Sequence, residues 1–308
     1  MTDAGRRTPG GALLVVGDVV TDVVARHRTP LAPATDTAAA IRTLPGGAGA
    51  NAACWAARSG HPDVRLLGRV GTESAGWHER ALTGAGVRPL LVPDPEAPTA
   101  TVIALVDAAA ERTFLTDGGA VLRLCPADWS AGLLDGVAAL HLSGYLFFAA
   151  PSRAAALLAL RDARAAGIPV SVDPASAAFL AELGPGRFLE AVAGASLLLP
   201  NADEARLLTG APDAETAARE LSRRVPLVAV TLGAAGALVA EAGTVTARVA
   251  APAVPPERRV DSTGAGDAFT GAFLAARLAG ADPVEAAGAG CAAGAEAVTV
   301  VGGRPPSV

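Results

Sequence analysis

The sequence predicts an α/β protein in which one mostly parallel sheet is covered by helices on both faces. Short apolar runs with strand character alternate with helical segments, and strands that alternate with helices form parallel sheets. The chain has 308 residues, of which 51% are hydrophobic, so residues 1–308 can bury a large core as one domain. Polar or glycine residues directly follow several of the apolar runs, at the strand ends where parallel sheets bind ligands. These residues are Gly17, Gly144, Asp173, Asn201 and Gly233.

Composition and charge narrow the class of protein. A net charge of −5 is unsuited to binding nucleic acid or an anionic membrane, so neither partner is expected. The three cysteines are far apart and match neither a disulfide framework nor a C-x-x-C metal site. Residues 1–10 lack the apolar segment of a signal peptide, and no apolar run reaches the ~18 residues that a membrane span needs. We therefore expect a soluble, cytoplasmic protein.

The first element is an apolar run from Leu13 to Val24, which predicts a buried strand. On an extended chain Asp18 and Asp22 point to the same side, so both carboxylates can face one cleft. Buried carboxylates are costly without partners, and two of them at a strand end therefore mark a candidate site. The alternative is a strand that ends near Gly17 and leaves both carboxylates in solvent.

A glycine-rich turn then leads into a helix of small residues that ends at Gly60. Gly46 and Gly47 allow the backbone to approach a ligand closely, and Asn51 offers both a donor and an acceptor to a polyol. Tight packing of this helix against the sheet is the alternative explanation.

A strand from Val64 to Val70 and a helix from Trp77 to Thr83 continue the alternation. Two β-rich runs, Thr99 to Val106 and Arg112 to Thr116, then interrupt it and are joined by a polar segment. These runs predict a hairpin that belongs to a small accessory sheet.

The second half of the chain alternates strands and helices regularly. The predicted strands are 138–144, 169–173, 196–199, 227–232, 236–239 and 244–249, and the predicted helices are 152–166, 202–208, 214–223, 268–278 and 283–297. This alternation is the main evidence for the parallel sheet.

Two short motifs in this half can serve structure or ligand binding. Asn201 stands at a predicted helix start with Glu204 three residues later, which is the spacing of a capping box. The same pair can order magnesium-bound water near phosphates. The stretch from Thr231 to Gly236, which includes Gly233, predicts a tight turn between strands whose backbone amides can line a nucleotide.

The stretch from Val260 to Gly271 carries the strongest chemical signal. Gly264, Ala265 and Gly266 form a turn that opens onto a helix, and the unpaired N–H groups at a helix start bind phosphate. Asp267 follows at once and can take the proton from a hydroxyl group that attacks the bound phosphate. The alternative is that this aspartate only stabilises the helix N-terminus.

Several other phosphate-binding motifs are excluded. The chain contains no lysine, which rules out a Walker A loop and the strand lysine of protein kinases. Phe269 occupies the third glycine position of a dinucleotide-binding fingerprint, which argues against a dehydrogenase. If the chain binds ATP, it does so through backbone amides and bound metal.

Together, these motifs resemble those of the ribokinase-like (PfkB) family of carbohydrate and nucleoside kinases. The stretch from Asp261 to Phe269 resembles the family's C-terminal signature, and that from Gly46 to Asn51 its N-terminal signature. The N-x-x-E element from Asn201 to Glu204 and the turn from Thr231 to Gly236 also match, in the same order and at similar separations. The resemblance implies a three-layer α/β/α fold with a central, mostly parallel sheet and a small β lid. Residues of about 28–45 and 97–118 would contribute that lid.

The resemblance also implies roles for individual residues. Asp267 would be the base that deprotonates the sugar hydroxyl, and the amides of Gly264, Ala265 and Gly266 would form the anion hole. The positions that would hold the hydroxyls of the acceptor are Asp18, Asp22, Gly46, Gly47 and Asn51. The positions that would contact ATP are Asn201, Glu204, Thr231, Gly233 and Gly236.

Cofactors and assembly follow from the same resemblance. ATP and Mg²⁺ are expected, and Glu204 would hold the magnesium ion through water. Asp261 and Thr263 match part of the monovalent-cation site of many members, which makes K⁺ a candidate cofactor. The lid forms a dimer clasp in several relatives, so a homodimer through the lid is an open expectation.

The acceptor stays open between several classes. We expect a small sugar such as ribose or fructose, or a sugar acid such as 2-keto-3-deoxygluconate, whose carboxylate Arg112 could meet. A nucleoside kinase, for adenosine or pseudouridine, would use the same acceptor residues and would also need a platform on which the base stacks. The low aromatic content of 4% favours a plain sugar, and the candidate platform residues are Phe114, Tyr145, Phe147 and Phe148. A third hypothesis is a protein that has the kinase fold and binds a sugar but does not catalyse phosphoryl transfer. The presence of Asp267 argues against it.

Overall fold

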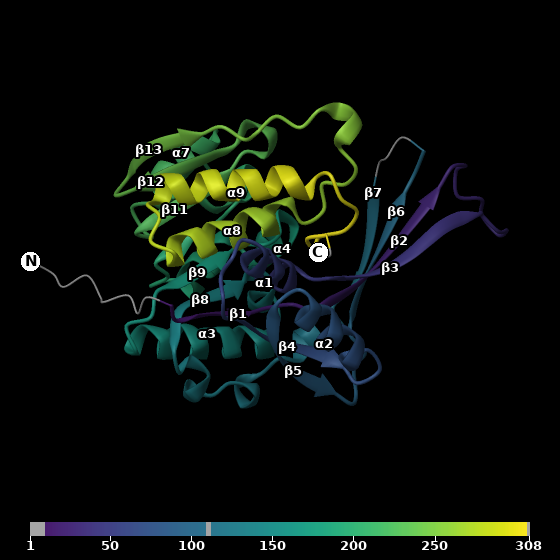
Figure 1. The fold of residues 1–308 in the computed structure, drawn as a ribbon, viewed down its shortest axis with the longest axis horizontal. Coiled ribbons are helices and arrows are strands. Elements are labelled where there is room, and N and C mark those ends of the chain that lie inside the picture. The colour runs from purple at the N-terminus through teal and green to yellow at the C-terminus, as the bar shows by residue number, and fades with distance from the viewer. Residues whose placement is uncertain (1–9, 109–111, 307–308) are drawn as a thin grey trace, which may run out of the picture.

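The centre of the molecule is a nine-stranded sheet in the order β13-β12-β11-β10-β9-β8-β1-β4-β5 (Figure 1). The computed structural model describes residues 10–108 and 112–306. The strands from β11 to β5 in that order run parallel, whereas β12 and β13 extend one edge in antiparallel orientation. This arrangement confirms the predicted mostly parallel sheet.

Most strands of the main sheet lie within a few residues of their predicted bounds, but the first strand and one edge strand differ from the prediction. The strands are β1 Ala12–Val16, β4 Val64–Gly71, β5 Val87–Asp94, β8 Val137–Ser143, β9 Val170–Asp173, β10 Leu197–Leu198, β11 Leu227–Thr231, β12 Ala237–Glu241 and β13 Thr244–Val249. The edge strand β5 was not predicted, because Pro89 and Pro93 interrupt its strand pattern. Proline is tolerated in an edge strand, where half of the backbone N–H groups have no neighbouring strand to bind.

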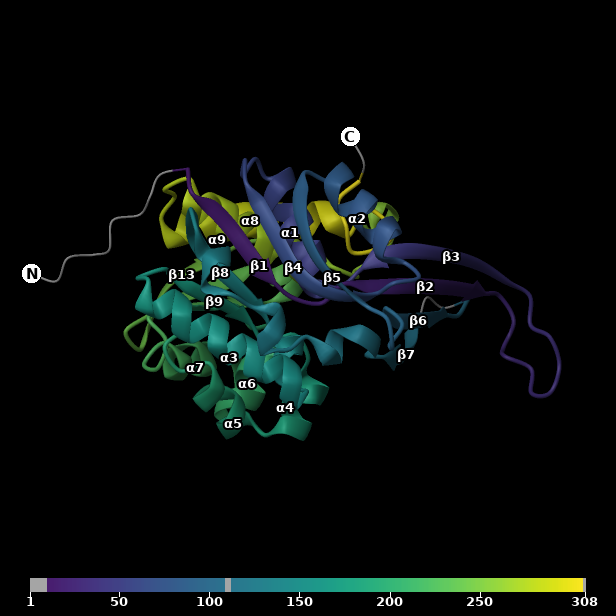
Figure 2. The same ribbon diagram turned by 90° about the horizontal axis from the view of Figure 1, so that it is seen from below.

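Helices cover both faces of the sheet, as Figure 2 shows. One face carries α1 Ala48–Arg58, α2 Ala75–Gly84, α8 Ala265–Leu278 and α9 Pro283–Ala297, and the other α3 Ala150–Ala165, α4 Ala177–Leu183, α5 Pro185–Ala191, α6 Ala202–Thr209 and α7 Ala214–Leu221. The short helices α4 and α5 were not predicted. The apolar residues form one large buried cluster on each face, so the three-layer prediction is confirmed. Within the described part of the chain, no helix combines the length and the apolar character needed to cross a membrane.

A second sheet projects from one end of the main sheet and forms the lid (Figure 1). It has the order β3-β2-β6-β7, and its strands are β2 Val20–His27, β3 Ala39–Gly46, β6 Ala100–Val106 and β7 Arg112–Asp117. The predicted hairpin is confirmed as β6 and β7, which pair in antiparallel orientation.

The prediction of one continuous strand from Leu13 to Val24 is wrong. The chain leaves the main sheet after β1, turns at residues 17–19 and enters the lid as β2. The turn passes directly under α1, because a Cβ atom on Gly17 would lie 2.8 Å from the Cα atom of Gly49. The lid therefore begins at the sheet edge where parallel strands present their carboxyl ends.

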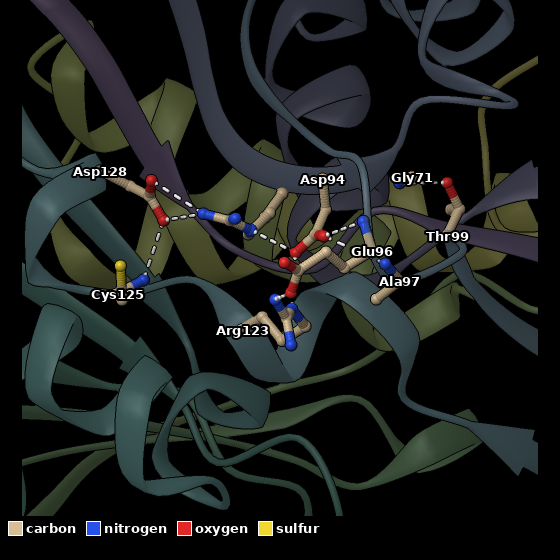
Figure 3. A network of polar contacts seen from close by, with 9 residues as sticks. Gly71, Asp94, Glu96, Ala97, Thr99, Arg123, Cys125 and Asp128 are labelled. Carbon is tan, nitrogen blue, oxygen red and sulfur yellow. Dashed lines mark hydrogen bonds and ion pairs between the residues drawn. The ribbon is translucent and has the colours of Figure 1, made fainter.

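A network of ion pairs fixes the base of the lid (Figure 3). Asp94, the last residue of β5, accepts hydrogen bonds from Arg69 Nε at 2.8 Å and from Arg123 Nε at 2.7 Å. The guanidinium of Arg69 also pairs with Asp128 at 2.8 Å. Asp94 precedes β6, and Arg123 ends the 3₁₀ helix Gly119–Arg123 that follows β7. The network thus ties both ends of the β6–β7 hairpin to the main sheet.

Candidate active site

A cavity of about 780 Å³ lies between the strand ends of the main sheet, the starts of α1 and α8, and the lid. It collects most of the residues that the sequence predicts for the acceptor site and for catalysis. The predicted residues that line it are Asp18, Asp22, Gly47, Asn51, Asn201, Glu204, Thr231, Thr263, Gly266 and Asp267. A more open groove of about 680 Å³ adjoins it at Asn201 and Thr231 and includes Gly233. The two predicted ligand regions are therefore neighbours.

Asp267 lies in the first turn of α8 and lines the larger cavity. Gly264 caps this helix with φ of 75°, and a Cβ atom on it would lie 2.3 Å from the Cα atom of Gly303. One carboxylate oxygen of Asp267 accepts a hydrogen bond of 2.8 Å from Asn51 Nδ2 in α1. Burial raises the pKa of Asp267 well above its ordinary value, and the neighbouring carboxylates Asp173, Asp18 and Asp22 raise it further. A carboxyl group with a raised pKa is suited to accept a proton near neutral pH.

The start of α8 leaves backbone N–H groups for an anion. Helix geometry gives the N–H groups of the first turn no intrahelical acceptor. The N–H of Ala265 makes a long contact of 3.4 Å with the carbonyl of Ser262, and Ala268 N–H donates to the carbonyl of Gly264. Gly266 lines the cavity, and a Cβ atom on it would meet nothing within 4 Å. The amides of Gly266 and Asp267 are therefore the best placed to bind a phosphoryl group.

The carboxylate of Asp18 makes its hydrogen bonds to groups of the protein rather than to a ligand. Its carboxylate accepts hydrogen bonds from the backbone N–H groups of Ala48 at 2.6 Å and Gly49 at 3.1 Å, and from Ser143 Oγ at 2.7 Å. It thereby satisfies N–H groups at the start of α1 and holds Asn51 in place. Gly47 lies against the same residue, since a Cβ atom on it would come within 2.5 Å of the Asp18 carbonyl oxygen.

Asp22 lies on β2 and lines the cavity together with Asp267. Burial raises the pKa of Asp22 to about 7, and the carboxylate of Asp18 adds to the effect. Gly46 is needed beside it, because a Cβ atom on Gly46 would lie 2.1 Å from Asp22 Oδ2. The predicted glycine pair thus makes room for two aspartates.

The capping box at Asn201 and Glu204 exists as predicted. Asn201 Oδ1 accepts from the N–H groups of Asp203 and Glu204 at 2.9 Å, and Glu204 Oε2 accepts from Asn201 N–H at 2.9 Å. Glu204 also faces the cavity, close to Asp173 at the end of β9. Burial raises the pKa of the Glu204 carboxyl, and repulsion from Asp173 raises it further. The motif therefore combines helix capping with a carboxylate at the site.

Five predicted positions lie outside both lining sets, namely Gly46, Gly236, Asp261, Gly264 and Ala265. Gly236 has φ of 96°, and a Cβ atom on it would lie 1.9 Å from the carbonyl oxygen of Val249, so close packing accounts for this glycine. Asp261 is buried and accepts hydrogen bonds from the N–H groups of Thr263 at 2.8 Å and Gly302 at 3.1 Å. The side chain of Arg112, the candidate partner for a sugar acid, lies outside the described residues.

Asp173 and Thr270 are site residues to which the sequence analysis assigned no role. Thr270 Oγ1 donates to Asp173 Oδ2 at 3.1 Å, and both residues line the cavity. Thr270 follows Asp267 on the same side of α8, which is a usable signal in the sequence. Asp173 was noted only as a polar residue after a strand.

An aromatic cluster forms the far wall of the cavity. Tyr145, Phe148 and Phe179 line it together, with ring centroids 5.1–6.0 Å apart. The sequence analysis missed Phe179, which lies on the unpredicted helix α4. It also wrongly included Phe147, which is fully buried in the core against Phe188.

Comparisons with known proteins agree with this geometry. A family model described as "pfkB family carbohydrate kinase" matches residues 12–308. A fructokinase of Klebsiella pneumoniae is 32% identical over 279 residues, which cover 86% of this chain and 84% of that protein. The structure of adenosine kinase from Sinorhizobium meliloti superposes with a TM-score of 0.87 at 24% identity and covers 96% of both chains. A putative ribokinase II from E. coli in complex with ATP and Mg²⁺ has a TM-score of 0.82 at 24% identity, covering 95% of this chain and 94% of that one.

The mostly parallel sheet between two helix layers and the small second sheet are those expected from the resemblance, and the family match spans nearly the whole chain. The chain belongs to the PfkB family of carbohydrate kinases and is a phosphotransferase.

Proposed function

We propose that this kinase transfers the γ-phosphoryl group of ATP to a hydroxyl group of a small, neutral sugar. The observation that carries the proposal is the place of Asp267 at the start of α8, where it lines the acceptor cavity and is held by Asn51. Asn201 and Thr231 line the same cavity and also the adjoining open groove. A hydroxyl group in the cavity and a phosphate at the start of α8 would both be within reach of this carboxylate.

The reaction needs little beyond positioning and charge stabilisation. Asp267 takes the proton of the acceptor hydroxyl as its oxygen attacks the γ-phosphorus, and the bond from that phosphorus to the bridging oxygen of ADP breaks. The N–H groups of Gly266 and Asp267 stabilise the negative charge on the transferring group. The lid excludes water, which would otherwise accept the phosphoryl group.

The residues at the cavity floor fit a magnesium ion. Mg²⁺ prefers oxygen ligands and is held by one or two carboxylates together with phosphate oxygens and water. Glu204 and Asp173 supply two neighbouring carboxylates at the junction with the groove. Among the described residues no cluster of three or more metal-ligating side chains occurs, which suits an ion shared with phosphates. When bound, Mg²⁺ neutralises charge on the phosphates of ATP.

The charge of the cavity favours a neutral acceptor. Six carboxylates line it, and among the described lining residues there is no arginine or histidine to meet an anionic acceptor. These carboxylates are Asp18, Asp22, Asp117, Asp173, Glu204 and Asp267. The sugar acid alternative is therefore weaker than a neutral sugar, whose hydroxyl groups can donate to Asp22.

A nucleoside is the second candidate acceptor, and the aromatic wall supports it. Phe148 and Phe179 are stacked with centroids 5.1 Å apart, and Phe114 of the lid lines the same cavity. Each base stacked on an aromatic side chain gains about 1–3 kcal/mol. The ribose would bind at Asp22 and Asn51, and the base would extend towards this wall.

The decisive experiment measures ADP release by the purified protein with Mg-ATP over neutral sugars, sugar acids and nucleosides. A rate well above the background with a single class identifies the acceptor. Phe179→Ala separates the two candidates, because it would raise KM for a nucleoside by about tenfold and leave KM for a plain sugar unchanged. Background rates with every acceptor, despite measurable ATP binding, would overturn the proposal.

Potassium dependence, dimerisation and a cytoplasmic location belong to the same proposal. Asp261 organises the loop before α8, so the panel is run with and without K⁺ to test the cation site.

The outer face of the lid supports a dimer, because Ile41 and Leu115 are 64% and 54% exposed there. Light scattering tests the dimer, and Leu115→Asp should yield a monomer. Cell fractionation tests the location.

A further inference from the structure

The segment from Gly302 to Arg304 packs against residues of the active site. Gly302 N–H donates to Asp261 Oδ2 at 3.1 Å, and the carbonyl of Gly303 accepts from Trp55 Nε1 at 2.9 Å. A Cβ atom on Gly303 would lie 2.2 Å from Asn51 Nδ2, so this segment touches the residue that holds Asp267. Both ribbon views show the yellow segment that follows α9 close to α1 (Figures 1 and 2). The position of Arg304 is thus fixed against the catalytic elements.

Arg304 is buried with few partners. Its Nη2 atom makes one long hydrogen bond of 3.4 Å, to the carbonyl of Gly46 at the end of β3. Nε and Nη1 are buried and find no hydrogen-bond partner among residues 10–108 and 112–306. Burial lowers the pKa of Arg304, since it penalises the charged form. A cation held in this way needs a compensating negative charge nearby.

Asp22 is the carboxylate that acts on Arg304, since its charge raises the pKa of the guanidinium. Gly46, whose carbonyl contacts Arg304, also lies directly against Asp22 Oδ2, which a Cβ atom on Gly46 would approach to 2.1 Å. The guanidinium and the carboxylate therefore share Gly46 as a common neighbour. Arg304 is absent from the residues that line the cavity, whereas Asp22 is part of the lining, so the arginine acts from behind the acceptor site.

The other charged groups around Asp22 oppose its ionisation. Asp18, from the turn before β2, and Asp261, from the loop before α8, both raise its pKa, and Arg304 is the cation that lowers it. His78 of α2 bonds to the neighbouring Thr21 at 3.1 Å, but burial lowers the pKa of His78 to about 4, so it is neutral near pH 7.

We propose that Arg304 is a positioning residue of the acceptor site, which favours the charged form of the Asp22 carboxylate and keeps it in place to accept hydrogen bonds from the acceptor. The inference rests on the proposed role of Asp22 in binding acceptor hydroxyl groups. Arg304 would thereby increase the affinity for the acceptor without touching it.

The test compares Arg304→Met with Arg304→Lys in the full-length enzyme, with the acceptor identified by the panel. Methionine removes the charge and keeps much of the volume, whereas lysine keeps the charge. We expect Arg304→Met to lower kcat/KM for the acceptor by about fivefold or more at pH 7, because an opposite charge changes a carboxyl pKa by about one or more. The loss should appear in KM for the acceptor, disappear towards pH 9, and be largely restored in Arg304→Lys. KM for ATP should not change.

Asp22→Asn supplies the control that separates this inference from the proposed function. In that background Arg304→Met should add no further pH-dependent loss, because no carboxylate remains to be held charged. If Asp22→Asn raises the acceptor KM but Arg304→Met leaves the pH profile unchanged, the role of Arg304 is wrong and the proposed function stands. If Asp22→Asn itself has no effect on the acceptor KM, the proposed acceptor site is wrong. Arg304→Gln replaces Arg304→Met if the latter does not fold, and a pH-independent loss in either variant would assign Arg304 a purely structural role.

Discussion

Replacing Asp267 with asparagine separates proton transfer from the structural role of this residue. Asparagine has nearly the same shape, and its side-chain oxygen can still accept the hydrogen bond that Asn51 Nδ2 makes at 2.8 Å. The N–H groups at the start of α8 belong to the backbone and stay in place. The substitution therefore removes the proton acceptor and little else.

The expected loss of activity follows from that single change. A positioned general base contributes about 10²–10⁴-fold to a rate. The kcat of Asp267→Asn should fall by this factor, which corresponds to about 3–5 kcal/mol of activation free energy. ATP binding should be nearly unchanged, because the phosphate contacts are made by main-chain groups.

The thermal stability of Asp267→Asn should rise, although its activity falls. Asp267 is partly buried near Asp18, Asp22 and Asp173, and burial together with these carboxylates raises its pKa in the folded state. A carboxyl with a higher pKa in the folded than in the unfolded protein contributes its full stability at low pH. That contribution is lost as the pH rises through the folded pKa. Asparagine does not titrate, so Asp267→Asn should melt at a higher temperature than wild type, and the difference should grow with pH.

Two measurements test this reasoning together. Turnover is followed as ADP release with the identified acceptor, and thermal unfolding is recorded between about pH 5 and pH 9. Asp36→Asn, an exposed substitution in the β2–β3 connection, should match wild type in both measurements. Turnover of Asp267→Asn within tenfold of wild type would refute the role of the base. An unchanged dependence of the melting temperature on pH would refute the electrostatic account.

Three further predictions concern the metal, the chain end and the lid. Glu204→Gln should raise the Mg²⁺ concentration needed for half-maximal rate, and an equal loss at every Mg²⁺ concentration would argue against a metal role. Gly303→Ala places a Cβ atom 2.2 Å from an active-site amide nitrogen and should lower kcat, whereas Gly288→Ala, with nothing within 4 Å, should not. Asp94→Asn removes the carboxylate that two arginines share and should lower the melting temperature clearly more than Asp63→Asn, which breaks a partly exposed pair. Equal shifts in the last two variants would show that the network does not hold the lid.

Much of the fold and many site positions could be predicted from the sequence because they depend on neighbours along the chain. The alternation of apolar runs and helices predicts the parallel sheet. The glycine turn before Asp267 and the capping box of Asn201 and Glu204 are local patterns with direct physical causes. The structure begins α6 where it was expected, whereas α8 begins at Ala265, directly after Gly264, rather than at 268. The absence of lysine excludes whole classes of nucleotide site without any structure.

Tertiary structure alone decided how these pieces act together. The hydrogen bond from Asn51 to Asp267 joins residues 216 positions apart, and the aromatic wall combines the chain after β8 with a helix that the sequence pattern did not reveal. The departure of β2 into the lid depends on the close contact of Gly17 with α1, which no local pattern specifies. Likewise, nothing in the sequence around Arg304 relates it to Asp22. Burial, electrostatic repulsion and close approach depend on distances in space, and packing of the whole chain sets those distances.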